Sequence, residues 1–406
     1  MSARSTTRKN IISTRARTII SSDEDYNDIS EVSETFRETV PIKRSPSKKN
    51  IKHESSDDEQ EEYKHLNDIE HIIQCKGMYL GAFRNSEQNV YTAVISPRLK
   101  LTKEKTVIST GLLKMFDELA MNAVDQIAKS GRGKNKLTYI HFDVNNGGWF
   151  GCANDGKGIP IKIFPKDTRY IPEVLFTQPK SGSNFKEVKE GAGQNGIGIK
   201  LTTIMSSDVE IHVIDPSLDY TQKVSNNGRN ISAPVITAVK GTHKNMVHYR
   251  FKPDTNMIDE NTTESAWKDV LIKTSQCMIK RILDIRALID PSIEIRVNGA
   301  LLEPFPFEVY ASKLWRSYLT SKGINTMDDY ANKYHIISRK DLNLFIGLSP
   351  TFEHISYVNG ISVEKGGIHI KTLTNMLNNN FKERLKTKNS IKSRLLNLRA
   401  ASAVLP

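Results

Sequence analysis

The sequence predicts an α+β fold, because strong helix patterns and short strand patterns follow one another along most of the chain. Thr110–Ser130 carries a continuous apolar stripe at helical spacing. Lys136–Asp143 and Gly148–Ala153 have the composition of strands and are joined by an Asn-Asn-Gly-Gly turn. With 406 residues, the chain is long enough for two or three domains of about 100–200 residues each.

The first 65 residues are predicted to form a disordered, charged tail. They hold 12 Lys+Arg and 13 Asp+Glu with few large apolar side chains, so they cannot bury enough surface to offset the entropy of ordering. The basic cluster Lys43–Lys49 is typical of a nuclear-localisation signal, although such clusters also occur by chance. We therefore expect a nuclear protein, or one of a viral replication site if the source is a virus.

Ordered elements are expected from residue 66 onward. Ser109 or Thr110 can cap the long helix, and Gly131 can end it. The same periodicities predict helices at 66–74, 263–288 and 370–389, and strands at 209–214, 245–252, 292–297, 344–348 and 354–358. We place a domain boundary at 262/263, which gives a first domain of residues 66–262 and a second of residues 263–406.

The charge of the chain favours a polyanionic partner, and its hydropathy gives no membrane span. The formal net charge is +12, and residues 372–406 alone hold 7 Lys+Arg against 1 Asp+Glu. A basic surface of this kind attracts nucleic acid, although it can also serve solubility alone. No apolar run approaches the roughly 18 residues of a membrane-spanning helix, so no membrane partner is expected.

The first motif with chemical potential lies on the long helix. Glu118 and Asn122 are four residues apart, so their side chains share one face beside the apolar stripe. A carboxylate there can deprotonate a water molecule, and an amide oxygen can ligate Mg²⁺. Taken alone, such a pair is more often a solvated helix face.

Glycine-rich loops supply the other motifs. Asp155 in Asn154–Pro160 (NDGKGIP) follows a strand, where its carboxylate can accept a hydrogen bond from an exocyclic amine, and Gly158 lets the backbone approach a flat ring. Gly191–Lys200 (GAGQNGIGIK) precedes a helix and has backbone amides that can wrap phosphates. A polar loop at 181–184 (SGSN) has groups that can reach a ribose or phosphate. Each of these loops alone can equally be an ordinary turn.

Three of these motifs, the pair Glu118 and Asn122, then Asn154–Pro160, then Gly191–Lys200, resemble in their order and spacing the three sequence boxes of the GHKL ATPases. The flanking sequence narrows the resemblance to eukaryotic-type DNA topoisomerase II. Phe116–Asp125 (FDELAMNAVD) is similar to the FDEI..NAAD helix of that family. Ile355–Ile361 (ISYVNGI) and Lys365–His369 (KGGIH) resemble its SFVN…KGGRH stretch, which other GHKL branches lack. The resemblance covers about residues 66–390. It implies a GHKL (Bergerat) ATPase α/β sandwich followed by a C-terminally incomplete transducer domain.

The resemblance also implies ATP and Mg²⁺ as cofactors and roles for individual residues. Glu118 resembles the general base that activates the hydrolytic water, Asn122 the Mg²⁺ ligand and Asp155 the adenine contact. Lys200 is expected at the γ-phosphate, as the second catalytic residue. The other nucleotide-binding positions implied are Gly158, Ser183, Asn184, Gly193, Gln194, Asn195, Gly196, Ile197, Gly198 and Ile199.

Double-stranded DNA and a second copy of the chain are the implied partners. In the basic C-terminal helix, Lys386 and Lys388 line up with a lysine run that the family uses on DNA. Each lysine can neutralise a phosphate without reading a base, and a solvated helix end is the alternative. The implied function is the ATP-operated clamp (N-gate) of a type II topoisomerase, which closes a homodimer around a DNA segment during strand passage.

Departures from the family leave several alternatives open. Asp155 stands where the family usually has Asn, and Gln194 and Ile197 replace Arg and Tyr of the lid. The family's Gln-Thr-Lys, EGDSA and PLRGK motifs do not occur in the 406 residues. We therefore expect ATP binding without DNA cleavage by this chain alone, as a fragment, as one subunit of a split enzyme with a separate cleavage subunit, or as a degenerate relative. A non-catalytic nucleotide-sensing DNA-binding module, or another GHKL ATPase of the chaperone or mismatch-repair type, is the alternative function.

Overall fold

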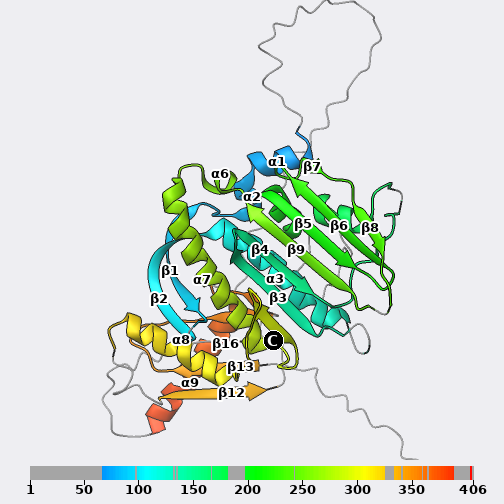
Figure 1. Ribbon diagram of the computed structural model, residues 1–406. Helices are drawn as coiled ribbons and strands as arrows, with labels where there is room; N and C mark the ends of the chain where they lie inside the picture. The colour runs from blue at the N-terminus through cyan, green and yellow to red at the C-terminus, as the bar shows by residue number, and fades with distance from the viewer. Residues whose placement is uncertain are drawn as a thin grey trace, which may run out of the picture. The chain divides into compact units, whose positions relative to one another are not determined.

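The computed structural model describes residues 66–404, apart from residues 97, 131–132, 134–135, 166, 182–196, 242, 325–332, 340–341, 359, 364 and 388–402. The tail predicted over residues 1–65 lies outside the described residues. Figure 1 shows the described elements as a large sheet, a long hairpin and a smaller sheet, with helices packed on them. No described helix is long and apolar enough to cross a membrane.

A mixed sheet dominates the first part of the described chain. Its order is β11-β10-β3-β4-β9-β5-β6-β7, and β8 also pairs with β6. Its strands run antiparallel to their neighbours except for β10 and β3, which are parallel. The strands are β3 (Tyr139–Asn146), β4 (Trp149–Asn154), β5 (Ser206–Ile214), β6 (Leu218–Ser225), β7 (Asn230–Ile231), β8 (Val235–Ala238), β9 (Met246–Pro253), β10 (Glu294–Val297) and β11 (Ala300–Leu301).

Helices and this sheet share one hydrophobic core. In β5, Val209, Ile211 and Val213 are buried and alternate with more exposed neighbours, as in a strand with one covered face. The same core contains buried residues of α3, α5 and α7. The helices are α1 (Asp68–Gln74), α2 (Lys76–Leu80), α3 (Thr110–Ser130), α4 (Ile171–Thr177), α5 (Gly198–Ile204), α6 (Thr255–Asp259) and α7 (Glu264–Leu288).

Helix α3 has the bounds that the sequence predicts. Leu112, Phe116 and Ala120 are fully buried along its apolar stripe, and burying a Leu or Phe side chain stabilises by about 1.5–3 kcal/mol. The Ser109 hydroxyl accepts a hydrogen bond from the Leu112 amide at 3.3 Å, which confirms it as the cap. The stripe therefore anchors the helix that carries Glu118 and Asn122.

The rest of the described chain forms a hairpin and a second sheet. Strands β1 (Asn85–Val94) and β2 (Lys100–Ser109) pair antiparallel, and both α7 and α8 (Phe307–Ser321) pack on the hairpin. The second sheet has the order β12-β13-β16-β14-β15. Its elements are β12 (Tyr334–Arg339), β13 (Leu342–Gly347), β14 (Ser356–Val358), β15 (Ile361–Ser362) and β16 (Ala403–Val404), and helix α9 (Ile368–Thr387) follows β15.

Two differences from the predicted elements have physical causes. The strand predicted from Lys136 begins at Tyr139, because Tyr139 is the first residue of this segment that pairs with β10, opposite Glu294. The large sheet continues across the predicted boundary at 262/263, since β10 pairs with β3 and α7 shares the core of α3. The division into two domains stays a prediction.

Candidate functional site

The structure brings the helix motif of Glu118 and Asn122 together with the end of the glycine-rich motif Gly191–Lys200. Glu118 and Asn122 lie one turn apart on α3, and both side chains are partly buried. A side-chain Cβ at Gly198 would collide with the Glu118 carboxylate. Because Gly198 has no side chain, the carboxylate of Glu118 can lie against the first turn of α5.

A lysine that the sequence analysis did not single out pairs with Glu118. Lys114 Nζ lies 2.6 Å from Glu118 Oε1, one helical turn earlier on α3. Burial lowers the pKa of Lys114, but the carboxylates of Glu118 and Asp117 outweigh burial and raise that pKa above its ordinary value. The i,i+4 spacing of Lys114 and Glu118 is the sequence signal that would have found this pair.

Lys200 is a buried cation on α5, with 3% of its surface exposed. Its Nζ donates a hydrogen bond to the Ser181 carbonyl at 2.6 Å. Burial lowers the pKa of Lys200 to about 8, because a low dielectric disfavours the charged form. Ser181 and Ile197 flank the segment 182–196, so this hydrogen bond brings the two flanks of the glycine-rich segment close to each other.

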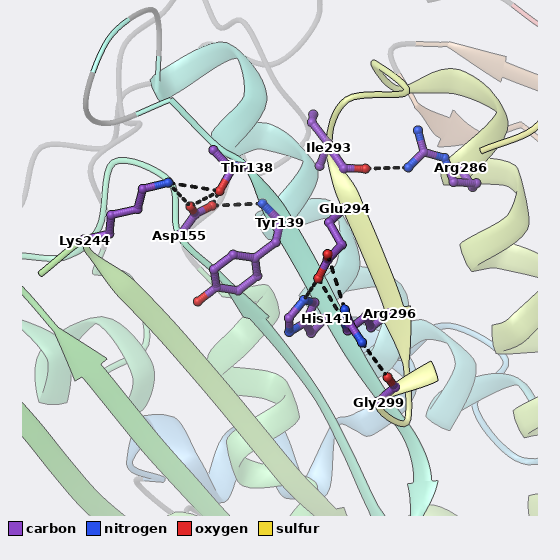
Figure 2. Close-up of polar contacts among 10 residues, drawn as sticks. All are labelled: Thr138, Tyr139, His141, Asp155, Lys244, Arg286, Ile293, Glu294, Arg296 and Gly299. Atoms are coloured by element: carbon purple, nitrogen blue, oxygen red, sulfur yellow. Dashed lines mark hydrogen bonds and ion pairs between the residues drawn. The ribbon is translucent and has the colours of Figure 1, made fainter. Parts of the chain in front are cut away.

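Asp155 is held by four donors from within the chain (Figure 2). Its Oδ1 accepts from the amides of Thr138 at 2.7 Å and Tyr139 at 3.0 Å. Its Oδ2 accepts from the Thr138 hydroxyl and from Lys244 Nζ, the latter at 3.3 Å. Burial raises the pKa of Asp155, but the hydrogen bonds from Thr138, Tyr139 and Lys244 outweigh burial and lower it below its ordinary value. Since a carboxylate has about four lone-pair positions, the set of acceptors is filled.

The glycines beside Asp155 allow close packing of the turn against its neighbours. A Cβ at Gly156 would lie 2.8 Å from Gln126 Cβ on α3. Gly158 has φ +76°, and a Cβ there would lie 2.6 Å from Asn245 Cβ. Asn245 in turn donates to the Lys157 carbonyl at 2.7 Å. The second motif thus packs on the helix of the first, and the approach that Gly158 permits here is to a side chain, Asn245.

The remaining predicted positions divide into three groups. Ile197 and Ile199 pack against the core, and the Ile197 carbonyl accepts from the Leu201 amide at 2.9 Å at the start of α5. Lys386 lies on α9, but its side chain is outside the described atoms. The predicted positions outside the described residues are Ser183, Asn184, Gly193, Gln194, Asn195, Gly196 and Lys388.

Asn122 and Lys200 have the donor types that a nucleotide with Mg²⁺ needs. Among the described residues, no three His, Cys, Asp or Glu side chains gather where they could hold a metal ion. Mg²⁺ is usually bound through one or two protein oxygens together with phosphate oxygens and water. The amide oxygen of Asn122 fits that role, and the buried cation of Lys200 fits a phosphate.

Comparisons with known proteins identify relatives of this chain. No family model matches the sequence. DNA topoisomerase 2 of Candida albicans is 28% identical over 346 residues, which cover 83% of this chain and 23% of that protein. The mitochondrial DNA topoisomerase 2 of Dictyostelium discoideum is 32% identical over 298 residues, covering 70% of this chain and 22% of that protein. The chain thus spans less than a quarter of the length of these relatives.

The comparison with solved structures shows which region of the topoisomerase II relatives this chain resembles. The crystal structure of the ATPase region of Saccharomyces cerevisiae topoisomerase II superimposes with a TM-score of 0.70 at 25% identity, over 85% of this chain and 86% of that one. The predicted α+β fold of the GHKL ATPase type is thereby confirmed. In sequence and in fold, the chain is a homologue of the DNA topoisomerase II family, and the part of that family to which it corresponds is the ATPase region.

Proposed function

We propose that this chain binds and hydrolyses ATP with Mg²⁺, as the ATP-operated clamp of a type II DNA topoisomerase. The observation that carries the proposal is the position of the Glu118 carboxylate against Gly198, on the same short helix as Lys200. The carboxylate of Glu118, from α3, and the buried cation of Lys200 thus both lie at the first turn of α5, next to the glycine-rich segment. The similarity to the topoisomerase II ATPase region supports the same function.

Each residue of the site has a defined task in this proposal. Bound ATP and Mg²⁺ supply the phosphoryl group and the cation that neutralises its charge, and Asn122 would hold the Mg²⁺. Glu118 accepts a proton from the attacking water, and Lys114 keeps the carboxylate oriented through its ion pair. Lys200 stabilises negative charge on the phosphate, which is where phosphoryl transfer needs it most. Asp155 accepts a hydrogen bond from the adenine amine.

Replacing Glu118 tests the hydrolytic part. Glu118→Ala should lower ATP turnover at least about 100-fold, since positioned general bases contribute about 10²–10⁴-fold, and should leave the Kd for ATP within a few-fold. Glu87→Gln on the exposed hairpin pair with Lys105 is the matched control and should leave both unchanged. Phosphate release that survives Glu118→Ala would remove the hydrolytic function.

A second candidate is a nucleotide-sensing module without turnover, and in both candidates the filled acceptor set of Asp155 limits the affinity for the nucleotide. The adenine amine has to displace a donor from this carboxylate, and Lys244 makes the longest of the four hydrogen bonds. If the chain is such a sensing module, ATP binds at millimolar concentration with Mg²⁺ and no phosphate is released by the unaltered chain. Absence of nucleotide binding under those conditions contradicts both candidates.

DNA and a second copy of the chain are the proposed partners, with DNA held between two protomers. The net charge of +12 and the basic helix α9 support a phosphate contact. Replacing Lys386 and Lys388 by Ala should weaken DNA binding equally across sequences and reduce its salt slope by about 2. Lys105→Ala, on the hairpin, is the control, and an unchanged slope in the double variant would locate the DNA contact elsewhere.

The proposed location of the protein is the nucleus. The basic cluster Lys43–Lys49 supports it, whereas one of the relatives is named as mitochondrial. A fluorescent fusion in which Lys43, Arg44, Lys48 and Lys49 are replaced by Ala should lose nuclear accumulation. Mitochondrial signal from the unaltered fusion would contradict the proposal.

A further inference from the structure

Helix α7 carries a buried arginine that connects the helix of Glu118 to the β14–β15 hairpin. The Arg281 side chain is 7% exposed. Its Nε donates to Asp117 Oδ1 on α3 at 2.6 Å, and its Nη2 donates to the Gly360 carbonyl at 2.7 Å. Gly360 lies in the turn between β14 and β15, within the ISYVNGI stretch. One guanidinium therefore holds two segments that are far apart in sequence.

The hairpin also touches α3 directly beside the same arginine. Gly360 has φ +77°, and a Cβ there would lie 3.2 Å from Met121 Cε. Met121 Sδ lies 2.9 Å from Arg281 Nη2, and the buried Tyr357 ring of β14 lies 5.5 Å from the guanidinium carbon. Arg281, the hairpin and this face of α3 thus form one packed unit.

A second set of buried contacts fixes the hairpin to α7. Lys280 Nζ donates to the Tyr357 hydroxyl at 2.9 Å and to Asp284 Oδ2 at 3.0 Å. Burial lowers the pKa of Arg281, but Asp117 and Asp284 outweigh burial and raise it. Two cations, Lys280 and Arg281, therefore face two carboxylates, and the hairpin is locked to α7 by charged groups rather than by apolar packing alone.

The position of Asp117 makes this link relevant to the reaction. Asp117 directly precedes Glu118, and Met121 directly precedes Asn122. In an α-helix, the side chains of adjacent residues point about 100° apart. Arg281 therefore contacts one face of α3, through Asp117 and Met121, while Glu118 and Asn122 project from the neighbouring face. A helix held in this way cannot rotate or slide without moving the Glu118 carboxylate relative to Gly198.

We infer that Arg281 is a positioning residue that ties the register of α3, and with it Glu118, to the β14–β15 hairpin. The inference rests on the proposed ATP hydrolysis and adds a route by which the chain beyond residue 262 acts on it. Displacement of a reacting group by about 1 Å can cost about 100-fold in rate. A partial loss of the link should therefore lower the rate of hydrolysis while nucleotide binding is kept.

Arg281→Lys in the full chain is the test variant. Lysine keeps the charge and can reach one partner, but it lacks the planar fork that bridges Asp117 and Gly360. We expect kcat for ATP hydrolysis to fall about tenfold, with KM and the Kd for ATP within twofold. Arg286→Lys is the matched control, because Arg286 is buried on the same helix. Among the described residues it donates to carbonyls of the loop that follows, at 2.5 Å to Ile293 (Figure 2) and at 3.0 Å to Asp290.

Asp117→Asn provides a second variant in case Arg281→Lys fails to fold. Because both changes break one link, the double variant should be no slower than the slower single variant. An unchanged kcat in both single variants, or an equal fall in Arg286→Lys, overturns the inference alone. An unaltered chain that binds ATP but does not hydrolyse it overturns the hydrolytic proposal as well, so the two failures are distinguishable.

Discussion

Lys200 and Asp155 are both buried ionisable residues of the site, and their environments act in opposite senses on charge. Asp155 receives four donors, so the charged carboxylate is favoured and its pKa falls. Lys200 has the Ser181 carbonyl as its hydrogen-bond acceptor, and burial lowers its pKa to about 8, which favours the neutral amine. An arriving phosphate would favour the charged form and raise this pKa again.

The affinity for ATP should therefore depend on pH through Lys200. A bound phosphate raises the pKa of Lys200, so above pH about 8 binding takes up a proton, and the affinity falls by up to about tenfold per pH unit. Below pH 8 the amine is already charged and this dependence disappears. Calorimetric titrations at pH 7 and pH 9, each in two buffers of different ionisation enthalpy, measure the proton uptake directly.

Lys200→Arg is the control for this dependence, because a guanidinium stays charged throughout the range. In the absence of nucleotide, the lowered pKa of Lys200 also determines how the stability of the fold changes with pH. The pKa of Lys200 in the folded chain lies below its ordinary 10.5, so the folded state binds fewer protons and its free energy of unfolding rises between pH about 8 and 10.5. Equal proton uptake by the unaltered chain and the Arg variant would mean that another group titrates.

Among the elements, the contact between α3 and α5 depends on a single glycine. Gly198 is the first residue of α5, and its φ is not in the left-handed region. Alanine there suits the helix and stabilises it by up to about 1 kcal/mol, so the steric effect falls on the Glu118 carboxylate. Gly198→Ala should lower ATP turnover at least about tenfold and change the melting temperature little.

Gly77→Ala on α2 is the matched control for this change. A Cβ at Gly77 would meet only Phe83 Cε1 at 3.8 Å, an ordinary contact. Its melting temperature and turnover should both match those of the unaltered chain. Full turnover in Gly198→Ala would show that Glu118 can act from another rotamer.

The elements that could be predicted are those whose own pattern decides their structure. Helix α3 is amphipathic and capped from within, so its bounds follow from local sequence. Strands β1 and β2 escape prediction because charged and polar residues interrupt their alternation, and α7 and α8 cover them from later in the chain. Helix α8 was not predicted, although Tyr310, Leu314 and Tyr318 repeat at helical spacing and are all buried.

The site divides in the same way. Glu118, Asp155 and Lys200 could be singled out because each belongs to a short motif of its own. Lys244 and Arg281 could not, because what defines them is a partner distant in the chain, Asp155 for one and Asp117 with Gly360 for the other. Proximity of that kind follows from the strand order and the helix packing, which the sequence pattern alone does not determine.

At the scale of the whole molecule, the main hydrophobic core of the described residues contains residues from both sides of the predicted boundary at 262/263. Helix α7 contributes Trp267, Met278 and Ile282 to the same core as α3 and the large sheet. Figure 1 shows α7 running between the β1–β2 hairpin and the large sheet. Removing α7 would expose apolar surface on both, and exposure of apolar surface to water costs about 25 cal/mol of free energy per Å².

Two fragments should therefore differ sharply in stability. Residues 66–262 end before α7 and β10, and we expect this fragment to lack a cooperative thermal transition. Residues 66–324 retain α7, the β10–β3 pairing and the α8 residues Tyr310 and Leu314 of the same core. That fragment should unfold in one cooperative step, because its core is nearly complete. Circular dichroism melts of both fragments measure the difference. A cooperative transition in residues 66–262 alone would support the boundary at 262/263 and would mean that α7 docks on a domain that is already stable.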